Sequence, residues 1–568
     1  MMNTPPAADE QSPAPHHTRR RLIHAAIVIL LVLALALTPP LLNVGRLRHR
    51  IATSMSQSLG RPVHLDNVSF HLLPVPGFTL QNLVVSEDPA FGNEPVIRAN
   101  EVEATLRISS LWRHQIEIST IRFKVDENGS GPSLNIVRNA QGRWNLEEIF
   151  MQAAHANTAP TDQRKAGPAP RFPYIEATGA RVNLKLGDEK MPFSLTDADF
   201  ALWLPEPQQW HVRLLAHPAR TDTNASDTGE VRLEGTLGHA ASMAAVPVNL
   251  TLSWAHAQMG EATRLLTGDD QGWRGVVEAG ATLIGPLATA QLATTLHITD
   301  LRRADFVPEK LLDVSSHCTA VADLTLVTLT QATCTIPTGA AQPIVLASPS
   351  VDLQQPRHAP ATLAFNQMPL SWALDWARLF TQRMPTDTIA TGTLDGQLTW
   401  KNPQPNPQPT ATPAWQGQFQ STVLSTTSNG HSYHPAKPLV SEWTGSVTFY
   451  TAAQQPTIHF QFSTPQPGAR QPLLFGGDFV SDHLAALLFE GTATPSQIAS
   501  VGNALWSPLG NQAIEPLKTT PNEPAIPVSL KCAFPPPEGQ PYCTAARTTG
   551  PEKPLKPHRA GAPKLRHS

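Results

Sequence analysis

The four cysteines are the residues in this sequence that could most readily do covalent chemistry. They form two local pairs, Cys318 with Cys334 and Cys532 with Cys543. Cysteines in even number and at short spacing are typical of disulfides in an oxidising compartment. Neither spacing matches a zinc signature, and no histidine stands at ligand spacing from either pair. We expect two structural disulfides, with unpaired thiols as the alternative, and no metal site.

Other combinations of residues that support catalysis are missing from the sequence. It contains no GxSxG, Walker A, HExxH or GxGxxG motif. The neighbouring acids Asp197/Asp199 and Asp269-Asp270 have the character of solvated loop residues. Because the net charge is −3, no basic field favours nucleic acid. We therefore expect a protein that is not an enzyme, binds no cofactor and has no nucleic-acid partner.

The composition favours a chain built from strands. Charged residues make up 15% of the chain, below the roughly 25% typical of soluble domains. The 55 prolines are about twice the average usage. A chain of 568 residues is long enough for several domains or for one long repetitive β-architecture. We predict many strands, turns and Pro-rich connectors, and few helices that are rich in charged residues.

A stretch near the N-terminus has the length and composition of a membrane helix. Residues 22–42 are predominantly apolar and reach the roughly 20 residues that a helix needs to cross a bilayer. Three arginines, Arg19–Arg21, precede the stretch and favour a cytoplasmic N-terminus. A cleavable signal peptide is the alternative, but the apolar run is longer than usual and lacks a clear cleavage site. We predict a disordered cytoplasmic tail over residues 1–21, followed by a transmembrane helix over 22–42.

Residues 51–150 show the clearest strand pattern. After a short helix over Ser54–Leu59 that Gly60 ends, apolar and polar residues alternate in successive segments, which indicates strands with one apolar face. Such strands are typical of antiparallel sheets. The region closes on Asn145, a good N-cap with Glu148 at the capping-box position, which predicts a short helix. The apolar positions expected on one face are Val68, Phe70, Leu72, Phe78, Leu80, Val102, Leu106, Ile108, Ile116, Ile118 and Phe123.

The order of the pieces in this region resembles the N-terminal region of the AsmA family. The matching pieces are the LGRPV entry, the LLPVPGFTLQNL turn, the DPAFG step, the EVEATLRISSLW strand and the NxxGxWN ending. Each piece alone is a weak signal, whereas the ordered set is specific. The resemblance covers about residues 22–150.

The resemblance implies an inner-membrane-anchored protein of a diderm bacterium, single-pass, with its C-terminal bulk in the periplasm. AsmA-like proteins resemble bridge-like lipid transfer proteins, whose long curved sheets carry an apolar groove. The apolar positions above would then line a groove for phospholipid or another membrane lipid. A one-sided apolar sheet can shield acyl chains at roughly 0.8 kcal/mol per buried CH₂. Taken alone, the alternation favours the core of a closed sandwich or barrel.

Two functions therefore stay open. The first is transfer of phospholipid along the groove toward the outer membrane, in support of envelope integrity. The second is a structural or regulatory role, in which the protein organises outer-membrane assembly partners and carries no cargo. An open apolar groove would favour the first function, and a sealed core would favour the second.

The remaining chain is predicted to continue as sheet between linkers. Helices are expected at Ala255–Leu266 and at Ser371–Phe380; core packing is favoured for the second, with a lid at a groove mouth as the alternative. The fold class is thus mainly β, with an N-terminal transmembrane helix, a long curved antiparallel sheet and a few short helices. The expected divisions are an AsmA-like β region at 51–150, a linker at 151–172, a β-rich middle region at 173–400, a linker at 401–414, a C-terminal β region at 415–513 and a Pro-rich, largely disordered tail at 514–568.

Overall fold

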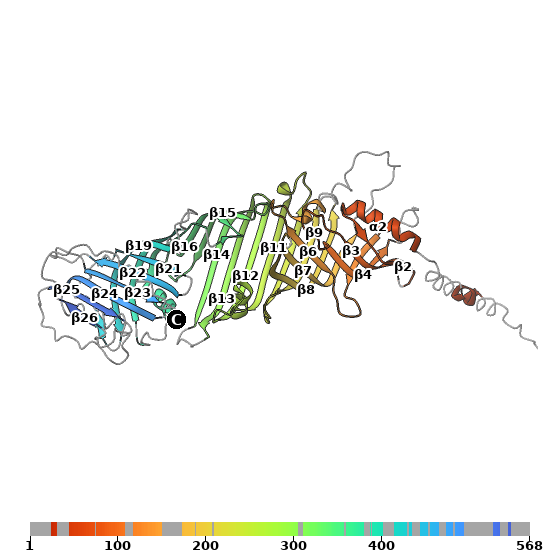
Figure 1. Cartoon of the computed structure of the whole chain (residues 1–568). Helices are drawn as coiled ribbons and strands as arrows, with labels where there is room; N and C mark the ends of the chain where they lie inside the picture. Colours follow the sequence, from red (N-terminus) through yellow and green to blue (C-terminus); the bar gives the residue numbers. More distant parts are fainter. Residues whose placement is uncertain are drawn as a thin grey trace, which may run out of the picture. The chain divides into compact units, whose positions relative to one another are not determined.

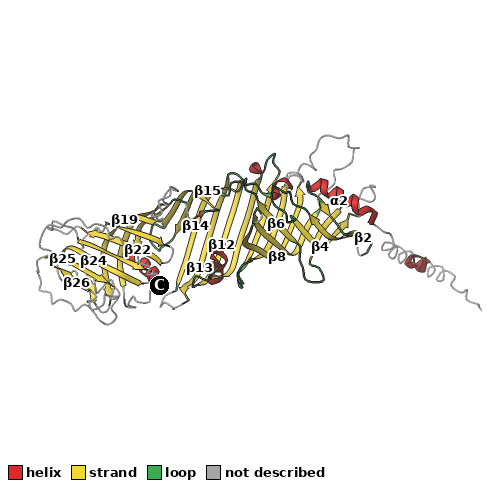
Figure 2. Cartoon of the chain, viewed as in Figure 1, coloured by secondary structure: helices red, strands yellow, loops and turns green. Residues whose placement is uncertain are grey.

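The architecture is mainly β, as predicted (Figure 2). The structure of the chain is a computed structural model. It describes residues 24–30, 45–73, 75–107, 118–149, 173–187, 189–206, 209–304, 311–356, 359–379, 387, 389–401, 414–428, 431–433, 444–452, 455–464, 473–480, 483–493, 526–533 and 543–546.

The helices of the described residues are short. They are α2 (Gly45–Leu59), α5 (Met259–Thr267), α6 (Leu370–Arg378) and the 3₁₀ turn η2 (Met243–Ala245), with further helical residues at 24–30 and 145–149. Within the ranges given above, none is both long and apolar enough to cross a membrane. Most of the predicted span at residues 22–42 lies outside those ranges, so the transmembrane helix stays a prediction.

The chain divides into two units. Unit 1 contains Met1–Gln271, Gly275–Leu296 and Val321–Val327, and the rest forms unit 2. Strands β13 (Ala290–Arg303) and β14 (Leu312–Asp323) give residues to both units. The other strands of unit 1 are β1 (Val63–His64), β2 (Asn67–His71), β3 (Gly77–Val85), β4 (Ile97–Leu106), β5 (Ile118–Lys124), β6 (Ser133–Arg138), β7 (Tyr174–Leu186), β8 (Glu189–Glu206), β9 (Gln209–Arg220), β10 (Glu230–Gly238), β11 (Pro247–Gln258) and most of β12 (Trp273–Pro286).

The sheet of unit 1 is mixed, so the prediction of a purely antiparallel sheet is wrong at one point. Neighbouring strands pair antiparallel from β2 to β5 and again from β7 to β12. Between these parts, β7 pairs parallel with β5 and with β6. A parallel pair needs a long crossover, which the chain between Arg138 and Tyr174 supplies. Alternation in a sequence predicts the buried side of a strand but says nothing about its direction.

Helix α2 covers the apolar side of the sheet where the sheet begins (Figure 1). The predicted helix over Ser54–Leu59 is only its C-terminal part, and it ends as expected before Gly60, whose φ is +66°. Glycine adopts this left-handed conformation without steric cost. The side chains of Ile51, Ala52 and Met55 pack on a buried core made of Leu65, Val68, Leu80, Leu83, Ala99 and Val102.

The two helices predicted inside the sheet regions are present, with one corrected boundary. Helix α5 begins at Met259 rather than Ala255, because β11 continues to Gln258. Helix α6 matches its prediction closely, and Trp372 packs against a buried cluster of Ile344, Phe365 and Met368. The core role favoured for α6 is therefore confirmed.

Unit 2 holds two groups of antiparallel strands. The predicted linker at residues 402–413 lies outside the described ranges. Strands β25 and β26 form a hairpin within the tail that was predicted to be largely disordered. The strands are β15 (Thr328–Ile336), β16 (Ile344–Asp352), β17 (Ala361–Pro369), β18 (Ile389–Lys401), β19 (Ala414–Ser428) and β20 (His431–Tyr433), then the six-stranded sheet of β21 (Thr444–Ala452), β22 (Gln455–Thr464), β23 (Leu473–Val480), β24 (His483–Ala493), β25 (Ile526–Ala533) and β26 (Cys543–Ala546).

Candidate functional site

The first cysteine pair forms a structural cross-link. A disulfide joins Cys318 of β14 to Cys334 of β15, with the two Cα atoms 3.9 Å apart. The second pair is placed by the backbone alone, where Cys532 of β25 lies directly opposite Cys543 of β26. The side chains of this second pair are outside the described set, so their disulfide stays a prediction.

The acids singled out in the sequence have structural roles where their contacts are known. Asp199 accepts a hydrogen bond from the backbone N–H of Gly179 at 3.1 Å, next to an irregularity in the β7–β8 pairing. Asp197 has a left-handed backbone, with φ of 49°. Across the described residues, no group of three or more His, Cys, Asp or Glu side chains could hold a metal ion.

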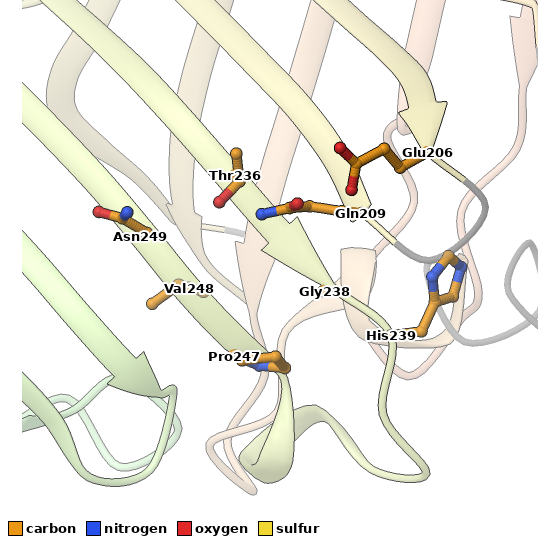
Figure 3. Close-up of a pocket in the computed structure, with 8 residues that line it drawn as sticks. All are labelled: Glu206, Gln209, Thr236, Gly238, His239, Pro247, Val248 and Asn249. Carbon is orange, nitrogen blue, oxygen red and sulfur yellow. The ribbon is translucent and has the colours of Figure 1, made fainter.

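A polar pocket of about 660 Å³ lies where β8 to β11 end or begin (Figure 3). Thr236 and Asn249 lie directly opposite each other on neighbouring strands, so they share the polar side of the sheet. A hydroxyl and an amide here can hydrogen-bond a small polar molecule, but the walls do not suit an acyl chain. The lining residues are Glu206, Gln209, Thr236, Gly238, His239, Pro247, Val248 and Asn249.

The most extensive feature of unit 1 is one unbroken row of apolar side chains across ten strands. Residues directly opposite each other on paired strands share a face, so the row can be followed from register to register. Its nine strand spacings of about 4.8 Å give a length of about 43 Å along the sheet. In order, the row is Val68, Leu80, Val102, Phe123, Ala177, Phe200, Leu214, Leu233, Leu252 and Ala281.

The row is buried at one end and only partly buried further along. Val68, Leu80 and Val102 are buried beneath α2. From Phe123 onward the members are only partly buried, including Leu214, Leu233 and Leu252 on three successive strands. Partly exposed apolar side chains on so many adjacent strands are unusual for a surface that faces water alone.

The opposite side of the same strands is polar. Arg213, Glu234 and Thr251 are exposed and lie opposite one another on β9, β10 and β11. Further toward the N-terminus, Lys124 lies 2.6 Å from Glu103, and this hydrogen bond holds the pKa of the Glu103 carboxyl below its usual value. Unit 1 therefore has one polar side, which suits contact with water, and one apolar side, which suits contact with an apolar partner.

The sheet of unit 1 curls toward its apolar side. Arg138, at the end of β6, donates a hydrogen bond to the carbonyl of Leu326 at 3.3 Å, and Trp144 Nε1 donates to the carbonyl of Leu324 at 3.4 Å. Leu324 packs beside the β12–β13 turn at Leu287, six strand spacings from β6. Across six strand spacings, a flat sheet would separate β6 from β12 by about 29 Å. Because Leu324 packs with apolar-side residues such as Leu250, the apolar side is the inner one.

The groove-lining residues predicted from the sequence lie mainly in the covered part. The rings of Phe70 and Phe78 are 5.3 Å apart, and Leu106 is buried, while Leu72 and Ile118 are half-buried. Ile108 and Ile116 lie outside the described residues. Five of the predicted positions belong to the core beneath α2 or pack against it: Val68, Phe78, Leu80, Val102 and Phe123.

The uncovered stretch from β7 to β12 was not assigned to a groove from the sequence. The sequence does contain a signal for the apolar side of this stretch. Val248, Leu250, Leu252 and Trp254 alternate with polar residues, which predicts a strand. What separates an uncovered face from a core face is whether another element packs on it, and alternation does not report this.

Residues from the short motifs near the N-terminus meet in a polar cluster around a buried arginine. Arg61 is 6% exposed and lies 3.0 Å from Glu148, 3.3 Å from Asp88 and 3.7 Å from Glu87. These residues come from segments far apart in the sequence that must meet for the first strands to assemble. The cluster pairs a cation with carboxylates from these segments, so its role is structural: it holds the segments together.

The predicted capping box at Asn145 is wrong. The Asn145 side chain is fully buried, accepts a hydrogen bond from the Val137 N–H at 3.0 Å and donates to the Asn135 carbonyl at 2.9 Å. It also donates to Glu87, while Glu148 pairs with Arg61. The helix at 145–149 is present, but tertiary partners take the side chains that would otherwise cap it.

Comparison with known proteins gives one match. The AsmA family matches residues 17–176, which confirms the resemblance seen in the sequence. No curated protein matches the chain, and no solved structure does. The matched segment includes the α2-covered core, the buried polar cluster and the first residues of β7.

Proposed function

We propose that this chain, whose residues 17–176 match the AsmA family, binds a membrane lipid on the partly exposed apolar side of unit 1. Acyl chains would pack on β7 to β12, and the polar head group would remain in water. Each CH₂ removed from water contributes roughly 0.8 kcal/mol, so a few methylenes on this face give useful affinity. Phospholipid is the lipid class that the family resemblance suggests.

The observation that carries this proposal is the partly exposed section of the apolar row, from Ala177 to Ala281. A core face would be sealed by another layer, as α2 seals Val68, Leu80 and Val102. Between Ala177 and Ala281 the row stays partly open along six strands, and the sheet curls around it. An inward-curled apolar surface of this length suits an extended hydrocarbon chain better than a globular ligand.

The proposed setting is the bacterial envelope. The apolar stretch at residues 22–42 would anchor the chain in the inner membrane, and the body would lie in the periplasm. The disulfide between Cys318 and Cys334 supports an oxidising compartment. In this setting the protein would pass lipid toward the outer membrane, together with an envelope protein partner. The alternative, a structural or regulatory role without cargo, would leave the uncovered face for a protein.

Lipid occupancy is the direct test. We would purify the full chain in mild detergent and determine bound lipid by native mass spectrometry. The test variant is Leu233→Gln with Leu252→Gln, two neighbours on the uncovered row. The matched control is Glu234→Gln with Thr251→Gln, two neighbours on the polar side of the same strands.

Comparison of the two variants distinguishes lipid bound on this face from lipid bound around a membrane anchor. We expect phospholipid adducts on the wild type and on the control, and a loss of at least one adduct from the test variant. Equal adducts on all three folded proteins would contradict binding at this face. A chain that carries no lipid at all would support the role without cargo.

A further inference from the structure

The turn between β14 and β15 contacts both the end of β6 and the β12–β13 turn in unit 1. We call this turn, residues 324–327, the strap. We propose that the strap is a releasable closure across the apolar side, and that Arg138 and Trp144 are the positioning residues that hold it shut. The proposal rests on the lipid-binding function given above, and it names the contact that regulates access to that face.

One side of the strap is firmly attached. The N–H of Leu324 donates to the carbonyl of Leu287 at 2.9 Å, and the Leu324 side chain joins a cluster with buried Val248 and Leu287. This attachment combines a backbone hydrogen bond with apolar burial. It therefore acts as the fixed side of the closure.

Among the described residues, the hydrogen bonds that hold the other side of the strap come from two side chains. Arg138 Nη2 reaches the Leu326 carbonyl at 3.3 Å, and Trp144 Nε1 reaches the Leu324 carbonyl at 3.4 Å. The guanidinium of Arg138 also lies 5.8 Å from the Trp144 ring, so the two residues hold each other in place. The Leu326 side chain is 63% exposed and adds little burial. Two long hydrogen bonds break more easily than the fixed side, which combines a backbone hydrogen bond with apolar burial.

The strap can move without losing its own shape. The Asp323 carboxylate accepts hydrogen bonds from the backbone N–H groups of Thr325 at 2.9 Å and Leu326 at 3.0 Å. These contacts are local and do not depend on Arg138 or Trp144. Release of the strap therefore costs the two side-chain contacts and leaves the turn intact.

Closure of the strap controls the access of an acyl chain to the apolar row. With the strap shut, the strap connects the end of β6 to the β12–β13 turn, which the register places at the opposite end of the strands. With the strap released, an acyl chain has a route to the row between the end of β6 and the β12–β13 turn. The strap would thus set the rate of loading and release rather than the final occupancy.

The test uses full-length protein and substitutions that keep side-chain size. Trp144→Phe removes the indole N–H donor and keeps an aromatic ring beside Arg138; a second variant adds Arg138→Gln. The control is Trp273→Phe with Arg303→Gln, because Arg303 lies 5.1 Å from the Trp273 ring in an equivalent pair away from the strap. Hydrogen exchange of residues 321–327 reports release of the strap. Transfer of a fluorescent phosphatidylethanolamine from phosphatidylethanolamine/phosphatidylglycerol vesicles reports loading.

We expect roughly five-fold faster exchange of the strap in Trp144→Phe, a larger increase in the double variant and no change in the control. Transfer should accelerate in the same order, with the same final level of bound lipid. Unchanged transfer in variants whose strap exchanges faster would overturn the proposal while leaving lipid binding intact. If the wild-type protein takes up no lipid, the proposed function fails, and the strap loses its regulatory role with it.

Discussion

At the scale of single residues, the AsmA-like segment contains a buried polar side chain, Asn145, whose amide oxygen and nitrogen are both hydrogen-bonded. Asn145 joins the backbone of β6 to Glu87, which itself lies beside Arg61. A buried side chain that satisfies backbone groups on another strand stabilises more than a surface cap does, because its loss leaves those groups unpaired. This accounts for an Asn at the end of the NxxGxWN motif in physical terms.

Replacement of Asn145 should therefore destabilise unit 1. We expect Asn145→Ala to lower the free energy of unfolding by about 2–3 kcal/mol, because the Val137 N–H and the Glu87 carboxylate lose a partner. Urea unfolding, with hydrogen exchange of β6 as the local probe, measures the effect. Asn93→Ala, at an exposed position, is the control and should change stability by less than about 0.5 kcal/mol. Equal effects at the two sites would contradict the buried role.

At the scale of elements, helix α2 decides which part of the apolar side is core. The strands on both sides of β5 carry the same kind of alternation and lie in one continuous register. Helix α2 packs on the beginning of the sheet, whereas α5, which follows β11, contacts β9 and β11. An amphipathic helix placed just after the predicted membrane segment thus converts the first part of the face into a core.

Matched leucine truncations should distinguish the two parts. Leu80→Ala, at a site that is 5% exposed, should cost about 2–4 kcal/mol of unfolding free energy because a cavity forms under α2. Leu252→Ala, on the uncovered part, should cost less than half as much in lipid-free protein, since water can fill the space. Chemical denaturation of both variants measures the difference. A cost at Leu252 as large as that at Leu80 would show that the β7–β12 face is sealed.

At the scale of the whole molecule, the AsmA-like strands are not a sheet of their own. β5 and β6 both pair with β7, and Asn183 of β7 donates to Asn135 of β6 at 3.0 Å. The Arg122–Glu176 ion pair adds a further link between β5 and β7. The division at residue 150 expected from the sequence therefore does not coincide with an end of the sheet.

Fragments of the chain should show whether the N-terminal strands depend on β7 for folding. A fragment of residues 45–150 would leave the β5 and β6 edges unpaired, so we expect it to lack a cooperative unfolding transition. A fragment of residues 45–336 includes β7 to β12 and the strap, so it should unfold cooperatively. Circular dichroism during thermal unfolding compares the two. Cooperative unfolding of the short fragment would show that the N-terminal strands fold independently.

The sequence by itself determined the class of structure, because strand periodicity and turn residues are local properties. Alternation around Val68, Leu80 and Val102 was enough to predict strands with one apolar side. The order of short motifs was enough to identify the AsmA resemblance, and local cysteine spacing predicted the Cys318–Cys334 disulfide. Each of these signals depends on residues that are close together in the chain.

Only the tertiary structure decided where the apolar side is covered, how β7 is oriented and what Asn145 binds. These outcomes depend on contacts between distant segments: α2 on the first strands, β7 beside β5 and β6, and the strap beside Arg138 and Trp144. An apolar residue has the same local pattern whether a helix, a lipid or water lies above it. The physical reason is that burial belongs to an assembled surface, whereas periodicity belongs to a single strand.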